Sequence, residues 1–261
     1  MILKDKVAVI TGGSQGIGLA IAEAFAREGA KLVLVARGAD RLERACAALR
    51  AGGADAVGVA GDVGDEGAAL AAFAKVRELH GRLDILVNNA GSAFVARLGE
   101  TTLEQWNSVL SVHATGPFLM CREAVKLMVG GKTRGRIVNV ASVLGNTGSA
   151  MATAYSAAKA ALLGFSRALA KETSAQGITV NCICPGAVDT VLFHEGTIGA
   201  VAAKFKADPA ALVKGTLAAV PLGRLIQPSE VAELALYLCS DKAEGITGQA
   251  YNLCGGLDIH S

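Results

Sequence analysis

A glycine-rich run at residues 11–18, TGGSQGIG, constrains the fold of this chain more than any other feature. It follows the apolar stretch VAVI, which has the pattern of a buried strand, and it precedes LAIAEAF, which has helical periodicity. Gly12 permits a tight turn, Gly16 allows close approach of a pyrophosphate, and Gly18 lets the helix pack on the sheet. The helix N-terminus then offers free N–H groups to a phosphate. The spacing differs from the commoner G-x-G-x-x-G, so the run alone leaves a nucleotide site and an ordinary turn equally open.

The rest of the chain repeats this strand-to-helix pattern, and no linker or repeat divides it. Strands are expected at residues 7–11, 31–36, 56–61, 83–88, 136–142, 179–184 and 249–253. Helices are expected at residues 16–28, 40–51, 65–80, 102–129, 153–176 and 228–239. Nearly uninterrupted apolar strands that alternate with helices predict a parallel sheet covered on both faces. We therefore expect a single α/β domain over residues 1–261, with a Rossmann-type doubly wound parallel sheet of about seven strands.

Residues 189–222 interrupt this pattern before the last helix, because glycines and a proline are mixed there with apolar residues. We predict an irregular, mobile lid over a site, and a structural excursion without function is the alternative. The apolar residues of this lid that are expected near the site are Val191, Leu192, Phe193, Ile198, Val201 and Phe205. Such a wall suits a largely apolar ketone or alcohol.

Composition narrows the classes of function. The net charge of +2 is scattered along the chain, which argues against a nucleic-acid partner or a membrane surface. No run of about 18 apolar residues suits a membrane span, and no signal peptide is readable. The six cysteines lack C-x-x-C spacing, so we expect buried thiols in a cytoplasmic protein and no metal site, with a metal pair at Cys182 and Cys184 as the alternative. His80, His194 and His260 are expected on the surface or the lid.

Polar residues and glycines follow several of the expected strands. Asp62 follows the third strand, Asn88 ends the fourth, Ser142 ends the fifth, and residues 185–190 (PGAVDT) follow the sixth. Each is an ordinary turn sequence by itself. Because parallel strands end at one edge of an open sheet, these segments are expected to converge on a ligand site.

Tyr155 and Lys159 are four residues apart at the start of an alanine-rich helix, so both side chains lie on one face. An ammonium beside a phenol stabilises the phenolate and lowers the pKa of the phenol. The tyrosine then becomes a usable acid or base near neutral pH. The pair is weak evidence alone, and it becomes specific together with Ser142, the glycine run and the sequence NNAG at residues 88–91.

Taken together, these motifs resemble the short-chain dehydrogenase/reductase family, including members such as the 3-oxoacyl-carrier-protein reductases. The resemblance runs from residue 6 to residue 257. It implies hydride transfer between a nicotinamide and a ketone or secondary alcohol. It also implies a homotetramer as the usual assembly, with the helices at 102–129 and 153–176 forming dimer faces.

The resemblance also implies roles for individual residues. Tyr155 would exchange a proton with the substrate oxygen, Ser142 would hydrogen-bond that oxygen, and Lys159 would hold the nicotinamide ribose. The cofactor-binding residues that it implies are Gly12, Ser14, Gln15, Gly16, Ile17, Gly18, Arg37, Asp62, Val63, Asn89, Ala90, Gly91, Tyr155, Lys159, Pro185, Gly186, Val188 and Thr190.

His113 departs from the family's pattern. The family usually has an asparagine at this position, which supports a water relay to the active-site lysine. We hypothesise that His113 keeps the relay as a fourth catalytic residue and adds pH sensitivity, because histidine becomes charged near pH 6.5. A neutral substitution inside a helix is the alternative.

The residues at the end of the second strand indicate which of the two nicotinamide cofactors, NAD(H) or NADP(H), is preferred. Ala36 stands where members that prefer NAD usually carry an aspartate for the adenosine ribose. Arg37 follows and could pair with a 2′-phosphate, and Arg41 is a candidate second contact. The second basic residue that the family carries for this purpose is absent, because Gln15 stands at its position. NADP(H) is therefore favoured over NAD(H).

The leading function is an NADP(H)-dependent oxidoreductase that acts on a small-molecule ketone or secondary alcohol. An NAD-dependent alcohol dehydrogenase that works mainly in oxidation is the first alternative, and a non-catalytic dinucleotide-binding regulator is the second. A regulator would need no acid or base, which the intact catalytic set argues against. Lys204, Lys206 and Lys214 on the lid could meet an acyl carrier protein, or they could be solvated charges.

Overall fold

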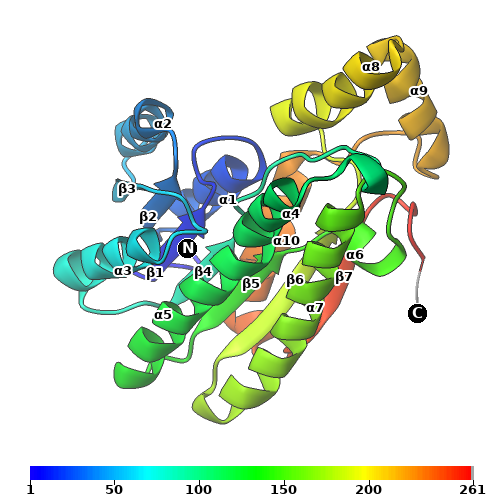
Figure 1. Ribbon diagram of the computed structural model, residues 1–261. Helices are drawn as coiled ribbons and strands as arrows, with labels where there is room; N and C mark the ends of the chain where they lie inside the picture. The colour runs from blue at the N-terminus through cyan, green and yellow to red at the C-terminus, as the bar shows by residue number, and fades with distance from the viewer. Residues whose placement is uncertain (260–261) are drawn as a thin grey trace.

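Seven parallel strands form one sheet in the computed structural model, which describes residues 1–259 and so leaves the prediction for His260 outside its range (Figure 1). The strands are β1 (Val7–Thr11), β2 (Lys31–Ala36), β3 (Ala56–Ala60), β4 (Ile85–Asn88), β5 (Arg136–Val140), β6 (Thr179–Pro185) and β7 (Ala250–Leu253). They lie in the order β3-β2-β1-β4-β5-β6-β7, so the order reverses between β1 and β4. The predicted Rossmann-type sheet is confirmed, and this switch point is where open α/β sheets bind ligands.

Helices cover both faces of the sheet. The α-helices are α1 (Gly16–Arg27), α2 (Ala39–Ala51), α3 (Glu66–His80), α4 (Leu103–Leu110), α5 (Gly116–Gly130), α6 (Leu144–Thr147), α7 (Thr153–Thr173), α8 (Gly199–Phe205), α9 (Pro209–Ala219) and α10 (Pro228–Cys239). No helix within residues 1–259 is long and apolar enough to cross a membrane.

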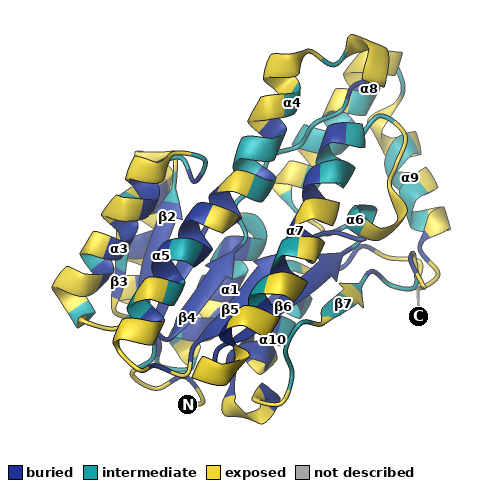
Figure 2. Cartoon of the chain, turned by 60° about the horizontal axis from the view of Figure 1, so that its bottom comes forward, coloured by how far each residue is buried: buried dark blue, intermediate teal, exposed yellow. Residues whose placement is uncertain are grey.

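Alternate residues of the central strands pack into two separate apolar cores. In β1, Ala8 and Ile10 face a core shared with α1, α2 and α10, whereas Val7 and Val9 face a core shared with α3, α5 and α7. Figure 2 shows the central strands buried between these helical layers. Because successive side chains of a strand point to opposite faces and both faces are covered, the strand sequences have to be apolar throughout.

The segment predicted as one helix at 102–129 is divided in the structure. Helix α4 ends at Leu110, a π-helical turn occupies Ser111–Thr115, and α5 begins at Gly116. Pro117 has no N–H to donate to the carbonyl group four residues earlier, and its ring crowds that carbonyl. The widened turn resolves this conflict, as π-bulges at functional sites often do. It contains His113.

Residues 189–222 are helical, so the prediction of an irregular segment is wrong. A π-helical turn at Leu192–Ile198 leads into α8, and Lys206 ends that helix with φ +51°. The carboxylate of Asp208 then accepts a hydrogen bond from the first turn of α9, where Pro209 needs no N–H donor. In Figure 1 the helices α8 and α9 extend beyond the end of the sheet, at the edge where the strands terminate.

The fifth strand ends at Val140, two residues before the predicted end at Ser142. The Ser142 hydroxyl accepts the N–H of Leu144 at 3.2 Å, and this contact starts the turn into α6. Ser142 therefore stands just beyond the sheet, where its side chain is not confined to the alternation of a strand. The other strand boundaries differ from the predictions by two residues at most.

Candidate active site

A cavity of about 1030 Å³ opens at the carboxyl ends of the strands, around the switch point. The segments after all seven strands contribute to its wall, among them the segment 189–222. Every site residue predicted from the sequence lines this cavity except Gly18. The ends of the strands therefore converge on one cavity, as the sequence predicted.

The turn after β1 leaves the start of α1 open toward the cavity. Helix α1 begins at Gly16, and its N-cap residue Gln15 makes no side-chain hydrogen bond to cap it. The first N–H groups of a helix have no partner within the helix, and they carry the positive end of its dipole. Gly12 and Gly16 have φ values of +68° and +56°, a left-handed conformation that glycine adopts readily. Together these features form a cradle for an anion.

Hydrogen bonds join the loop after β4 to this turn. The Asn89 side chain donates to the carbonyl oxygen of Thr11 at 3.0 Å, and the N–H groups of Asn89 and Ala90 donate to the Thr11 hydroxyl at 2.9 and 3.0 Å. A Cβ on Gly18 would lie 2.2 Å from the Gly12 carbonyl oxygen and 2.4 Å from Asn89 Nδ2. Gly18 therefore serves close packing beneath the cavity. Thr11 is a positioning residue that the sequence analysis did not single out, although it belongs to the glycine-rich run.

Three arginines form one end of the cavity, here called the arginine end: Arg37, Arg41 and Arg44. The Arg37 guanidinium lies 3.7 Å from the Asp62 carboxylate, and the Arg37 side chain is 67% exposed. Arg41 donates a hydrogen bond to the side-chain oxygen of Gln15. Arg44 was not predicted, and its spacing of three residues from Arg41 on a helix was the available signal.

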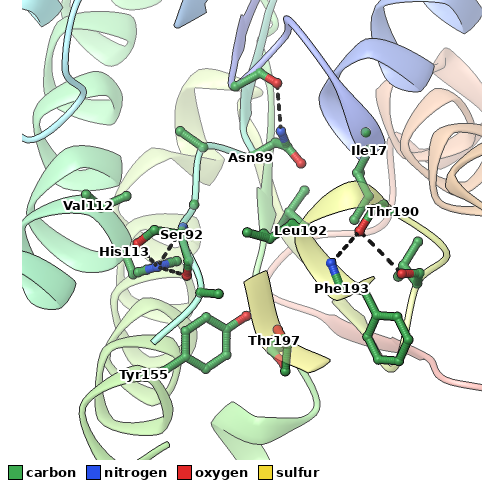
Figure 3. Close-up of a pocket in the computed structure, with 18 of the residues that line it drawn as sticks. Ile17, Asn89, Ser92, Val112, His113, Tyr155, Thr190, Leu192, Phe193 and Thr197 are labelled. Atoms are coloured by element: carbon green, nitrogen blue, oxygen red, sulfur yellow. Dashed lines mark hydrogen bonds between the residues drawn. The ribbon is translucent and has the colours of Figure 1, made fainter. Parts of the chain in front are cut away.

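Ser142, Tyr155 and Lys159 meet at the opposite end, here called the catalytic end. Tyr155 and Lys159 come from the first turns of α7, and the Tyr155 hydroxyl hydrogen-bonds with the Ser142 side chain. Tyr155 points into the cavity in Figure 3. A phenol and a serine hydroxyl that share one hydrogen bond can both reach a single oxygen atom of a ligand.

Burial raises the pKa of the Tyr155 phenol above its ordinary value, and the hydrogen bond with Ser142 opposes this rise. The expectation that Lys159 lowers this pKa is not met. The Lys159 Nζ lies 5.6 Å from the centroid of the Tyr155 ring, and it donates to the Val140 carbonyl oxygen at 2.7 Å. The ammonium is thus held by the sheet edge, away from the phenolic oxygen.

The Lys159 side chain is buried, and only 4% of its surface is exposed. Burial lowers the pKa of its ammonium to about 8. The ammonium therefore remains mostly charged at pH 7 and loses its charge in mildly alkaline solution. Val140, whose carbonyl oxygen orients the ammonium, contributes only backbone to this contact, so no side-chain pattern could have indicated it.

His113 lies between the loop after β4 and Tyr155. Its Nε2 is 3.2 Å from the Ser92 nitrogen, 3.1 Å from the Ser92 carbonyl oxygen and 3.4 Å from the Ser92 hydroxyl, as Figure 3 shows. Its ring meets the Tyr155 ring edge-on, with centroids 5.0 Å apart. Its Nδ1 is buried without a hydrogen-bond partner among the described residues. Ser92, which lines the cavity, was not predicted as a site residue.

The hypothesis that His113 adds pH sensitivity near pH 6.5 is not supported. Burial, and then the charge of Lys159, lower the pKa of His113 to about 3. The imidazole is therefore neutral over the whole range in which most enzymes work. The imidazole contacts both the Ser92 backbone and the Tyr155 ring.

The segment 189–222 forms the wall opposite Tyr155. Leu192, Phe193 and Thr197 face the cavity from this side in Figure 3, and Val191 and Val201 also line it. The Thr190 hydroxyl accepts the Phe193 N–H at 3.1 Å, which anchors the start of this wall beside the glycine turn.

Two predictions for apolar residues of this segment are corrected. Ile198 is buried outside the cavity lining, and Phe205 is 43% exposed beneath the Arg97 guanidinium. The helical turns point these two side chains away from the cavity, a direction that the composition of the segment could not indicate.

The lysines of the same segment lie outside the cavity lining. Lys204 forms an ion pair with Glu100. Neither Lys206 nor Lys214 makes an ion pair within residues 1–259.

The cysteines are free and buried, and Cys182 and Cys184 share one face of β6, as the alternation predicted. Burial raises the pKa of both thiols, so they stay protonated. Within residues 1–259, no group of three or more His, Cys, Asp or Glu side chains could hold a metal ion.

Comparison with known proteins gives consistent results. Residues 12–258 match the sequence profile of the family described as enoyl-(acyl carrier protein) reductase. The chain is 41% identical over 257 residues to a protein of Streptomyces virginiae that is named as a ketoacyl reductase of the monensin polyketide synthase, with 97% of each chain covered. It is 35% identical to the 3-oxoacyl-[acyl-carrier-protein] reductase of Escherichia coli, with 98% of this chain and 99% of the relative covered.

Solved structures agree with these relatives. A variant of the actinorhodin polyketide ketoreductase with NADPH superposes with a TM-score of 0.94 at 38% identity, and 98% of each chain is covered. The L-sorbose reductase of Gluconobacter frateurii, in complex with NADPH and L-sorbose, superposes with a TM-score of 0.92 at 36% identity and the same coverage.

Proposed function

The chain belongs to the short-chain dehydrogenase/reductase family, and we propose that it reduces a ketone with NADPH, with 3-oxoacyl thioesters as the preferred class of substrate. One observation carries the proposal: Ser142, Tyr155 and Lys159 stand together at one end of a cavity that continues to three arginines at its other end. The names of the relatives, which are ketoacyl reductases, support the class of substrate.

The residues present fit a dinucleotide with a 2′-phosphate. The uncapped start of α1 and the left-handed Gly12 and Gly16 form a cradle for a pyrophosphate. Arg37 at the end of β2 would hold the 2′-phosphate, and Ala36 presents no carboxylate to repel it. A bound reduced nicotinamide would supply the hydride. These features support NADPH over NADH.

The protein's own groups handle the proton. The Tyr155 hydroxyl donates its proton to the carbonyl oxygen of the substrate, and the Ser142 hydroxyl donates a hydrogen bond to the same oxygen. The raised pKa of Tyr155 keeps the phenol protonated at neutral pH, so the acid is ready for reduction. Lys159, whose ammonium is held by the Val140 carbonyl oxygen, would bind the ribose of the nicotinamide.

Residues 189–222 act as a lid in this proposal. Their apolar side chains cover the substrate opposite Tyr155 and exclude water from the reacting atoms. Docking of an acyl carrier protein would depend on Lys206 and Lys214, because Lys204 is already paired with Glu100. A thioester of coenzyme A is therefore a sufficient first substrate for a test.

We further propose a homotetramer in which α5 and α7 form a dimer face. Phe118 is 44% exposed on α5 and packs edge-on against Phe165 of α7, with ring centroids 6.4 Å apart. An apolar hollow between these helices, with Ala114 and Ala161 in its wall, would be covered by a second copy. Sedimentation of the purified protein tests this, and a monomer at working concentration would contradict it.

The functional test measures oxidation of NADPH and of NADH, separately, against 3-oxoacyl thioesters, cyclic ketones, aryl ketones and diketones. The proposal expects the thioesters to be reduced with NADPH at the highest kcat/KM. Faster turnover with NADH, or oxidation of alcohols in preference to reduction, would favour the NAD-dependent alternative. Cofactor binding without turnover of any carbonyl in either direction would favour the regulator.

A further inference from the structure

The lid, residues 189–222, makes two side-chain contacts with the segment that connects β4 to α4. The Lys204 ammonium of α8 forms an ion pair with the Glu100 carboxylate. The Arg97 guanidinium lies over the Phe205 ring, 5.9 Å from its centroid. This connecting segment passes beside α8 in Figure 1. Neither contact lies within α8, so both hold the lid to the rest of the molecule.

The two contacts stand next to residues that line the cavity. Val201, one turn earlier on α8, lines it, and so does Val95 of the connecting segment. The lid also packs on this segment directly, because a Cβ on Gly196 would lie 3.0 Å from the Cβ of Ala93. The lid and the segment therefore meet along one border of the cavity, and separating them would open the cavity on this side.

The connecting segment is fixed to the catalytic end, whereas α8 depends on its tertiary contacts. The Ala96 N–H donates to the Met151 carbonyl oxygen at 3.0 Å, which ties the segment to the turn before α7. Helix α8 has only seven residues, and a helix of that length is unstable in water by itself. Loss of its contacts should therefore free α8 to move and to unfold locally.

Both contacts are exposed to solvent, which limits their strength. The Lys204 and Glu100 side chains are 30% and 51% exposed, and Phe205 is 43% exposed. Water and salt screen an exposed ion pair, and an exposed contact between a cation and a ring is also weak. Two weak contacts can keep a lid closed and still break in every turnover, as a lid over an active site has to do.

We propose that the Lys204–Glu100 ion pair and the Arg97–Phe205 contact form a latch that holds the lid closed over the substrate and opens to admit it. The proposal rests on the proposed function, because it concerns the lid of the same site. With the latch closed, the apolar wall of the lid stays opposite Tyr155 and keeps water from the reacting atoms. With the latch open, the substrate can enter or leave between α8 and the connecting segment.

Hydrogen–deuterium exchange of the purified protein, without cofactor or substrate, tests the latch. We expect Lys204→Met to speed exchange of the α8 amides by about two- to fivefold, the effect of losing one exposed ion pair. Lys204→Glu should speed it at least as much, because two carboxylates then face each other. Glu100→Lys combined with Lys204→Glu should restore slow exchange, since the pair is rebuilt with its charges reversed. Added salt should speed exchange of α8 in the unaltered protein, and this response should be lost in Lys204→Met.

Lys75→Met is the matched control. Lys75 forms a comparably exposed ion pair with Glu78 on α3, and neither residue lines the cavity. This variant should leave exchange of α8 unchanged. Exchange of the β5 amides in the middle of the sheet should be the same in every variant, which shows that each variant is folded.

Steady-state kinetics with NADPH and a 3-oxoacyl thioester of coenzyme A separate the latch from the proposed function. The substrate KM should rise by about two- to fivefold in Lys204→Met and return toward its original value in the charge-reversed pair. Unchanged exchange of α8 in Lys204→Met and Lys204→Glu would overturn the latch, even if thioesters are reduced. Faster exchange with an unchanged KM would show that the contacts do not control access, which also overturns it. Faster exchange without turnover of any carbonyl would support the latch and overturn the proposed function.

Discussion

The two ends of the cavity differ in how far their charged and titratable groups are exposed to solvent. At the catalytic end, Lys159 and His113 are only 4% and 2% exposed, and burial lowers the pKa of both. At the arginine end, the Arg37 and Asp62 side chains are 67% and 44% exposed, and their charges lie 3.7 Å apart beside solvent.

The difference shows how one cavity can combine a rigid site with an adjustable one. A buried polar group that loses its partner is costly, so each group at the catalytic end has a single stable arrangement. Exposed charges are screened by water and salt, and each contributes little by itself. We therefore expect single changes to abolish chemistry at the catalytic end and to shift affinity by degrees at the arginine end.

The largest expected effect is that of Tyr155→Phe. Removing one hydroxyl takes away the proton donor, and kcat for ketone reduction should fall by about a hundred- to ten-thousandfold. The dissociation constant for NADPH should change by less than about threefold, because the substitution leaves the arginine end intact. Tyr237→Phe, at an exposed position on α10, is the control and should leave kcat unchanged. A comparable loss of NADPH binding in Tyr155→Phe would mean that the two ends are not independent.

The second effect is a loss of activity in alkaline solution. Because the pKa of Lys159 is about 8, the ammonium is charged below that pH and neutral above it. We expect kcat/KM to be level below about pH 8 and to fall by about tenfold per unit above it. In Lys159→Arg, which keeps its charge, this decline should disappear even if the maximal rate is lower. If kcat/KM of that variant declines at the same pH, a group other than Lys159 causes the decline.

The third effect concerns stability in mild acid. The pKa of His113 is about 3 in the folded protein and near 6.5 in the unfolded chain, so only the unfolded chain takes up a proton between these values. The free energy of unfolding should therefore decrease as the pH falls from 6.5, by about 1.4 kcal/mol per pH unit. Urea unfolding at pH 6.5 and pH 5 measures this. The decrease should be smaller in His113→Asn, and an equal decrease in both proteins would show that His113 does not cause it.

The smallest effect is that of Arg37→Ala. We expect NADPH binding to weaken by about tenfold or less, since Asp62 shares the guanidinium and solvent screens it. NADH binding should be nearly unchanged, and the difference between the two cofactors should shrink as salt is added. Titrations at low and high salt test this. If binding of NADPH and of NADH is weakened equally, Arg37 does not recognise the 2′-phosphate.

Most of the sheet and much of the cavity wall could be predicted from local patterns. The strands were found because both faces of a parallel sheet are covered, which leaves unbroken apolar runs such as that of β1. The loops after the strands were found because polar residues and glycines follow such runs, and parallel strands bring their ends together. The conformation of residues 189–222 was missed because Pro209 stands at the first position of α9, where it is tolerated, and because Gly196 and Gly215 lie inside helical turns although glycine disfavours a helix.

The roles of individual side chains were harder to predict. The pKa of His113 was expected near its ordinary value, and the structure lowers it because the ring is enclosed by the π-helical turn, Ser92 and Tyr155. The partner of Lys159 is the Val140 carbonyl group, which no sequence pattern reports. Gln15 and Arg41 are 26 residues apart in the chain and meet only through the packing of α1 and α2 on the sheet.

The sequence by itself determined the alternation of the strands with the main helices, the edge of the sheet at which ligands bind, and which residue types are present there. These depend on local periodicity and on the geometry of parallel strands, which every such chain shares. Only the tertiary structure decided which groups are buried, which partner each one has and therefore which charge it carries at neutral pH. Those properties depend on distances between residues far apart in the chain, because burial and nearby charges, rather than residue type, set the pKa and the strength of each contact.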